Sequence, residues 1–176
     1  MSIDTIKASI GDYAKDIRLN LPKVLSSEGA AGLTEHQIFV VALSCSYAVK
    51  NKAVVEAIIA QAGELLTETD KNAAKSAATI MAMNNIYYRF IHLVEDSEFA
   101  HMPAGLRMQV LMNSGIDKKD FELCALAVSA INGCGMCMDS HVKTLIQEGV
   151  SKQAVQSAIK IASVIHATAQ ALWIES

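Results

Sequence analysis

The sequence predicts an all-α fold, and three observations lead to that prediction. Apolar residues make up 52% of the 176 residues but aromatic residues only 5%, so the expected core is aliphatic. Alanine, the strongest helix former, is abundant, whereas proline, which breaks helices, occurs only at Pro22 and Pro103. Apolar residues recur with the i, i+3, i+4 spacing of helices, and the alternation typical of strands is missing.

Three helices are expected in the first part of the chain, each beginning at a residue whose side chain commonly caps a helix N-terminus. Thr34 has Gln37 three residues later, which is the pattern of a capping box. Asn51 and either Thr69 or Asp70 are the other expected caps. The apolar spacing after these caps predicts helices over residues 34–49, 51–65 and about 70–94.

Four further helices are expected in the second part of the chain. Pro103 is expected to open a short one, because proline is tolerated at the first helical position. Asp117 and Ser151 are expected N-caps, and Asn132-Gly133 is expected to interrupt the helical pattern. These signals predict helices over residues 103–110, 117–131 and 134–148, and from 151 nearly to the C-terminus.

A weak internal repeat suggests that one domain, residues 1–176, consists of two related helical halves. AMNN at 82–85 matches AING at 130–133 in kind, at an offset of 48 residues. The degenerate half would span about 34–95 and the active half about 103–176. Only the second half would then carry chemistry.

Composition excludes several classes of function. The net charge is -3 and no large basic cluster occurs, so no nucleic-acid partner is expected. The sequence contains no run of about 18 apolar residues, so no membrane span is expected. The first twenty residues lack the apolar region of a signal peptide. The expected location is therefore the cytoplasm, where a CxxC motif is more often catalytic or metal-binding than structural.

The segment INGCGMCMDSH, residues 131–141, contains the candidate chemistry. Cys134 and Cys137 are three residues apart, so a helix would bring them to one face. Because Asn132-Gly133 interrupts the pattern, Cys134 is expected in the first turn of the next helix, where the helix dipole and free N–H groups favour a thiolate. No strand precedes the motif, so it differs from a thioredoxin site and predicts a redox pair on a helical scaffold.

His141 and Glu122 are the candidate partners of this pair. His141 follows Cys137 by four residues, so a neutral imidazole there could take the thiol proton and then stabilise the thiolate. Glu122 is the one acid in the apolar run FELCALAVSAI. If the chain reverses at Asn132-Gly133, the two helices can pack antiparallel, and the Glu122 carboxylate would orient the imidazole.

Each of these residues also has a plainer interpretation. The CxxC could be half of a structural zinc site, although such sites use four ligands and only His141 is near the two cysteines. Glu122 could instead point into solvent at the edge of its helix. Cys45 and Cys124 are single and fall at helix-core spacing, where a cysteine acts as a small apolar side chain.

The run FELCALAVSAINGCGMCMDSH resembles the active-site segment of the alkyl hydroperoxide reductase D (AhpD) family, within the carboxymuconolactone decarboxylase-like superfamily. MSIDTIKASIGDYAKDIRLNL, AAKSAATIMAMNNIYYRF and GLRMQVLMNSGI resemble the same family, so the resemblance covers most of the chain. It implies an AhpD-like helical subunit, usually assembled as a homotrimer.

The resemblance also implies an antioxidant activity. Such proteins have a weak peroxidase activity toward organic hydroperoxides, and they reduce a partner peroxiredoxin, alkyl hydroperoxide reductase C (AhpC). No bound flavin, haem or metal is needed, because the electrons come from an external dithiol. In some members the donor is a lipoylated dihydrolipoamide acyltransferase, together with dihydrolipoamide dehydrogenase.

Residue roles follow from the same resemblance. Cys137 would be the attacking thiolate that passes through a sulfenic acid, and Cys134 would donate a proton and then close the disulfide. His141 and Glu122 would form the proton relay. The chain departs from some members, which have a histidine where Met136 stands. Methionine cannot move a proton, so a relay through that position is absent.

Three other functions remain open at this point. The chain could be mainly a disulfide carrier that docks a peroxiredoxin, with little peroxidase activity of its own. It could be a zinc-stabilised structural module. The wider superfamily also includes lactone decarboxylases, but those relatives do not rely on a CxxC pair, and its presence speaks against that option.

Overall fold

The computed structural model describes residues 1–176, and helices are the only regular structure in it. The all-α prediction is therefore confirmed. The α-helices are α1 (Ile3–Ser9), α2 (Lys15–Val24), α3 (Glu35–Ala48), α4 (Lys52–Ala62), α5 (Glu68–Leu93), α6 (Glu98–His101), α7 (Lys118–Ile131), α8 (Gly135–Gln147) and α9 (Lys152–Ile174). Short 3₁₀ turns occupy Asp12–Ala14, Gly63–Leu65 and Gln109–Leu111.

Two helices, α3 and α7, form the centre of the core. Every residue from Ile38 to Ser46 in α3 is buried, and so is every residue from Leu123 to Ser129 in α7. A helix that is apolar on all sides has to be surrounded, and α3 packs against α4, α5, α7 and α9. The buried hydroxyls of Ser44 and Ser46 bond to carbonyls of their own helix, so they cost little.

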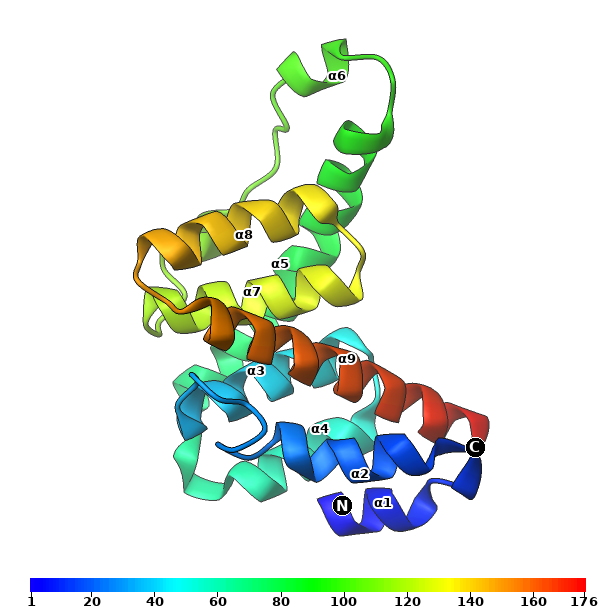
Figure 1. Cartoon of the computed structure of the whole chain (residues 1–176). Coiled ribbons are helices and arrows are strands. Elements are labelled where there is room, and N and C mark those ends of the chain that lie inside the picture. Colours follow the sequence, from blue (N-terminus) through cyan, green and yellow to red (C-terminus); the bar gives the residue numbers. More distant parts are fainter.

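The helices divide between two ends of the molecule. α1, α2 and α4 lie at the end that holds both termini, and α8 covers the other end beside α7 (Figure 1). α5 extends beyond α8, and the segment that carries α6 projects from its tip (Figure 1). None of the helices is both long and apolar enough to span a membrane.

Most of the expected helix caps are present. Thr34 and Gln37 form a capping box, and the side chains of Asn51, Asp117 and Ser151 each accept a backbone N–H of the helix that they begin. These polar side chains satisfy donors that the first helical turn leaves free. The hypothesis of two related halves within one domain stays a prediction.

The expected cap of α5 was wrong. Thr67 is the N-cap, rather than Thr69 or Asp70, and Asp70 is the third helical residue. Asp70 Oδ2 accepts from the Thr67 backbone N at 2.8 Å and from its hydroxyl at 2.6 Å, so the two residues form a capping box. The TETD run offers a threonine at two positions, but only Thr67 has an acid three residues later, which is the capping-box pattern.

The short helix expected to open at Pro103 was also wrong. Residues 103–108 are not helical, and the four-residue helix α6 ends before them. Gly105 has a φ of 64°, which a right-handed helix does not allow. None of residues 103–110 is buried, so this segment lacks the packing that stabilises short helices.

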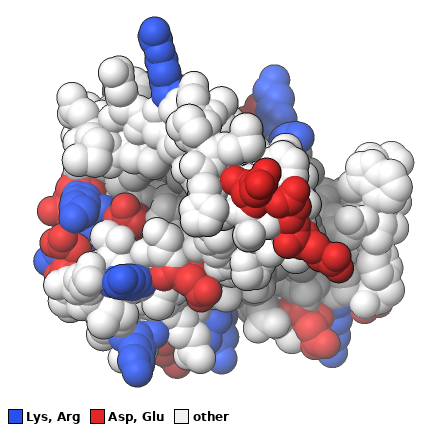
Figure 2. Space-filling model, turned by 90° about the horizontal axis from the view of Figure 1, so that it is seen from above, with Lys and Arg blue, Asp and Glu red and all other residues white.

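Acidic and basic side chains are scattered over the face seen from above. Figure 2 shows a run of acidic side chains to the right of the centre and basic side chains mainly near the edges, with no continuous basic area on this face. This distribution gives no support for a nucleic-acid partner there.

A polar junction ties the N-termini of α3, α5 and α7 together. His36 Nε2 lies 3.0 Å from Asp70 Oδ1, and His36 Nδ1 lies 3.5 Å from Asp120 Oδ2. Burial acts to raise the pKa of Asp70, but hydrogen bonds from Thr67 and His36 outweigh it and lower that pKa. The ionised form of Asp70 therefore stabilises the fold.

Replacing Asp70 tests this junction. Asp70→Ala should lower the free energy of unfolding by about 1–3 kcal/mol at pH 7, because it removes the acceptor of the Thr67 capping box and of His36. Since the folded pKa is lowered, this contribution is present above the unfolded value of about 3.9 and is lost as the pH falls through the folded pKa. Urea denaturation of both proteins at several pH values should show the difference narrowing below about pH 4.

Asp16→Ala is the matched control, because Asp16 is an exposed acid in the first turn of α2. Its effect should stay below about 1 kcal/mol. Equal losses for the two variants would contradict a special role for Asp70.

Candidate redox site

The reversal between α7 and α8 positions the first cysteine. At the end of α7, Gly133 N donates to Ala130 O and Cys134 N donates to Ser129 O, which together make a Schellman motif. Gly133 has a φ of 71°, the left-handed conformation that this motif requires. Cys134 follows at once as the N-cap of α8, and its Sγ accepts from Cys137 N at 3.3 Å.

Cys134 and Cys137 form a disulfide, and their Cα atoms are 5.3 Å apart. This separation lies within the usual range for disulfides, so both sulfurs meet without moving the backbone. Cys134 is completely buried, whereas Cys137 keeps 7% of its surface exposed. The two sulfurs therefore differ in access.

Glu122 and His141 face each other because α7 and α8 are antiparallel neighbours (Figure 1). Glu122 Oε2 is 2.7 Å from His141 Nδ1, and only 15% and 12% of the two side chains are exposed. An ionised carboxylate can only accept a hydrogen bond, so Nδ1 carries the hydrogen. Nε2 is then the nitrogen that can exchange a proton.

Met81 contacts that second nitrogen. Its Sδ lies 3.3 Å from His141 Nε2 and accepts the Ser129 hydroxyl at 3.4 Å. A thioether is a weak acceptor without a hydrogen to give. It can therefore interact with the protonated Nε2 but does not donate to the neutral one. The sequence patterns gave Met81 no role at the site.

A cavity of about 330 Å³ opens beside Cys137 and His141. Its walls come from three segments: α5, the stretch around the last 3₁₀ turn, and α8. Most of them are apolar. The lining residues that sequence analysis did not assign to the site are Met81, Asn84, Tyr88, Met108, Leu111 and Ser140. Residues 81, 84 and 88 share one face of α5, because they are three and four positions apart. This spacing does not predict which other helix or cavity they contact.

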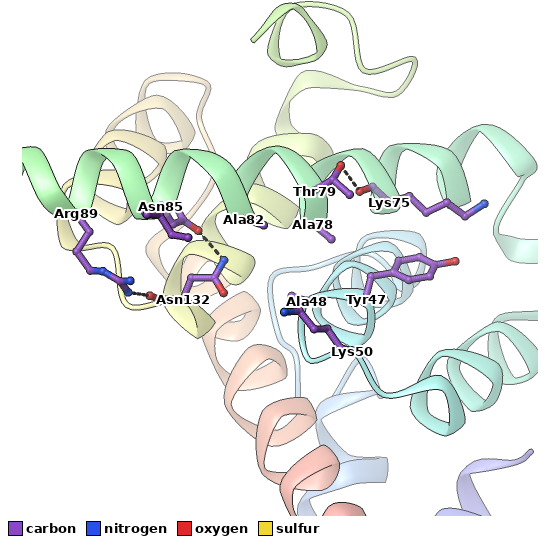
Figure 3. A pocket seen from close by; sticks show the side chains of 11 residues that line it. Tyr47, Ala48, Lys50, Lys75, Ala78, Thr79, Ala82, Asn85, Arg89 and Asn132 are labelled. Carbon is purple, nitrogen blue, oxygen red and sulfur yellow. Dashed lines mark hydrogen bonds between the residues drawn. The ribbon is translucent and has the colours of Figure 1, made fainter. Parts of the chain in front are cut away.

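A second network braces the loop before Cys134. Asn85 Nδ2 donates to Ser129 Oγ at 2.9 Å, and Asn132 Nδ2 donates to Asn85 Oδ1 at 2.9 Å. Arg89 Nη1 donates to the Asn132 carbonyl. Figure 3 shows Asn85 and Arg89 reaching from α5 to Asn132 at one end of a separate groove of about 480 Å³. The redox cysteines do not line that groove.

Cys45 and Cys124 lie in the core, as expected. Both are free thiols with no exposed surface. Burial raises the pKa of Cys45 well above its usual range and raises that of Cys124 to about 12. Both therefore stay protonated near neutral pH and are poor nucleophiles.

The structure gathers no ligand set for a zinc site. No group of three or more histidine, cysteine, aspartate or glutamate side chains could hold a metal ion. The disulfide uses both motif cysteines, and His141 is bonded to Glu122.

Known proteins resemble this chain over nearly its whole length. The model of the carboxymuconolactone decarboxylase family matches residues 97–174, a span that includes all four candidate site residues. The chain is 52% identical to alkyl hydroperoxide reductase AhpD of Coxiella burnetii over 99% of its length and 98% of that protein. Identity is 52% to the AhpD of Rhodopseudomonas palustris, covering 96% and 92% of the two chains. For the AhpD of a Bradyrhizobium species it is 48%, covering 98% and 93%.

Thiol labelling tests the difference between the two kinds of cysteine. In the reduced, folded protein, an alkylating reagent at pH 7 should modify no more than two of the four thiols. Cys45 and Cys124 should react only after denaturation, because burial keeps them protonated and inaccessible. Peptide mass mapping would locate the label, and rapid native labelling of Cys45 or Cys124 would contradict this assignment.

Proposed function

Because the chain belongs to the AhpD family of the carboxymuconolactone decarboxylase-like superfamily, we propose that it is a thiol-dependent alkyl hydroperoxide reductase. One observation carries the proposal. Cys137 and His141 line one cavity, and His141 Nδ1 is bonded to Glu122 while its Nε2 contacts the Met81 thioether, which has no proton to give. This is the arrangement of a nucleophile, a base and a group that orients the base.

The reaction begins from the reduced pair. His141 Nε2 takes the proton of Cys137, and the nearby imidazolium then stabilises the thiolate. The thiolate attacks the terminal oxygen of a hydroperoxide, so an S–O bond forms as the O–O bond breaks. The alkoxide that leaves takes a proton from His141, which gives an alcohol and a sulfenic acid on Cys137.

Cys134 completes the catalytic oxidation. Its sulfur displaces water from the sulfenic acid and forms the disulfide, for which the Cα separation of 5.3 Å already suits both residues. In sum, two thiols and one hydroperoxide give one disulfide, one alcohol and one water. An external dithiol then returns both cysteines to thiols by exchange.

The donor and the assembly are part of the same proposal. The external dithiol is a lipoylated protein such as dihydrolipoamide acyltransferase, the partner that receives electrons is the peroxiredoxin AhpC, and the subunits form a homotrimer in the cytoplasm. The apolar side chains of Ile86, Phe90 and Leu93 are 66%, 47% and 71% exposed along α5. Such a row supports an interface with another protein or another copy of the chain.

A disulfide carrier with little direct peroxidase activity is the second candidate. Gly133, Gly135 and Met136 are exposed around the disulfide, so a partner backbone could approach it closely. Thiol exchange needs access of that kind. Rates of peroxide consumption by the chain alone and with oxidised peroxiredoxin added would separate the two candidates.

The stoichiometry of thiol loss tests the peroxidase directly. One equivalent of an organic hydroperoxide should lower the free thiols of the reduced protein from four to two, with Cys134 joined to Cys137. Cys134→Ser should instead accumulate a sulfenic acid that dimedone traps, because no neighbouring thiol can resolve it. Full peroxide turnover by Cys137→Ser would contradict this mechanism.

Glu122→Gln tests the proton relay. The substitution keeps the shape of the side chain but removes the charge that stabilises the imidazolium, so the rate of peroxide-driven disulfide formation should fall on the order of 10²-fold. Asp139→Asn is the matched control, since Asp139 is an exposed acid on α8 close to the site. Stopped-flow mixing of the reduced variants with peroxide measures both, and an unchanged rate for Glu122→Gln would remove Glu122 from the relay.

A further inference from the structure

Asn84 lies in the wall of the redox cavity and carries a buried hydrogen-bond acceptor that has no partner in the protein. The residue lies on α5, is only 4% exposed, and lines the cavity together with Cys137 and His141. Its Oδ1 is buried and has no hydrogen-bond partner in the protein. Buried polar atoms almost always have a partner, so an exception at a reactive site points to a ligand.

The next residue along the chain shows how differently an asparagine behaves when its role is structural. Asn85 is 1% exposed, and both ends of its amide are bonded, to Ser129 and to Asn132. The two asparagines share a helix and a degree of burial, yet only Asn84 leaves its acceptor free. The free acceptor is therefore not a general property of polar residues on this part of α5.

Apart from the exposed Ser140 hydroxyl, the other walls of the cavity offer little competition for a hydrogen-bond donor. The hydroxyl of Tyr88 is directed to Met108 Sδ, at 3.9 Å, and Met81 Sδ faces His141 Nε2. Thioether sulfurs are weak acceptors. Among the residues that line this mainly apolar space of about 330 Å³, Asn84 thus carries the one buried side-chain acceptor without a partner.

We propose that Asn84 Oδ1 accepts the O–H of the substrate hydroperoxide and holds the terminal oxygen in front of Cys137. This inference rests on the proposed peroxidase function and adds a substrate-binding residue to it. The organic group of the substrate lies against the thioether and leucine walls. The inner peroxide oxygen then lies on the side of His141, which supplies the proton to the departing alkoxide.

The chemistry of the step needs such an anchor. The sulfur lone pair has to approach the terminal oxygen along the O–O bond, so that electrons flow into that bond as it breaks and leave on the inner oxygen. A substrate held only by apolar contacts could turn either oxygen to the sulfur. An acceptor specific for O–H selects the terminal oxygen and raises the fraction of productive orientations.

The same contact predicts discrimination between classes of peroxide. A hydroperoxide has an O–H to donate, whereas a dialkyl peroxide of similar size has none and would leave the buried amide unpaired. Sites built around a hydrogen bond reject analogues that lack it more strongly than apolar sites reject a change in size. Asn84 should therefore favour hydroperoxides specifically.

Asn84→Leu tests the proposal, because leucine has a similar shape and no acceptor. The reduced full-length variant is mixed with cumene hydroperoxide, and the second-order rate of disulfide formation should fall about tenfold, the effect expected for one lost hydrogen bond in the reaction. Alkylation of Cys137 by iodoacetamide is measured in parallel over a range of pH. It should be unchanged, because that reagent does not use the peroxide contact.

Stability gives an independent readout. Replacing an unpaired buried amide by an apolar side chain should leave the urea midpoint unchanged or raise it, while activity falls. A merely structural asparagine would show the opposite change in stability. Asn84→Ala adds no bulk and serves as the second variant, and Asn72→Ala, at an exposed asparagine of the same helix, is the matched control.

These measurements distinguish failure of the role proposed for Asn84 from failure of the proposed peroxidase function. If the wild-type protein forms no disulfide with peroxide, the peroxidase function itself fails. If the wild type reacts and both Asn84 variants match it, only the role of Asn84 is overturned. An equal loss in the peroxide and iodoacetamide rates would also overturn it, because the effect would then lie in the reactivity of the thiol.

Discussion

The tight reversal at Asn132 and Gly133 fixes the position of every reactive side chain. It ends α7 with a Schellman motif and starts α8 at the very next residue, so Cys134 has no alternative to the N-cap position. The same short connection sets the antiparallel register of the two helices. That register brings Glu122 and His141, nineteen residues apart, into contact at 2.7 Å.

α5 supports this pair of helices from one side with two separate rows of residues. Asn85 and Arg89 bond to the loop that precedes the disulfide, whereas Met81 and Asn84 line the cavity in front of it. Packing and chemistry are thus divided between neighbouring positions of one helix. The middle stretches of α3 and α7 are buried on all sides, and the helical walls of the redox cavity come from α5 and α8.

Sequence patterns predicted local features correctly. They failed for features that depend on packing between helices. Helix caps such as Thr34 and Ser151 depend on residues three positions apart, and they were found correctly. The motif residues could be identified because their types are rare in an apolar helix. The contributions of Met81 and Asn84 could not, since a methionine or asparagine on a buried face gives no sign of which helix it will meet. The helix expected at Pro103 failed for the related reason that its segment is exposed and contains Gly105 in the left-handed region.

Because the two cysteines are unequally buried, the two sulfurs of the disulfide differ in their accessibility to an incoming thiolate. An incoming thiolate can reach only the sulfur of Cys137, since Cys134 has no exposed surface. Exchange is therefore regioselective: the mixed disulfide forms on Cys137, and Cys134 is the leaving group. The N–H of Cys137 points at that departing sulfur, and the positive end of α8 favours the negative charge it acquires. The helix N-terminus thus assists the opening of the bond as well as its formation.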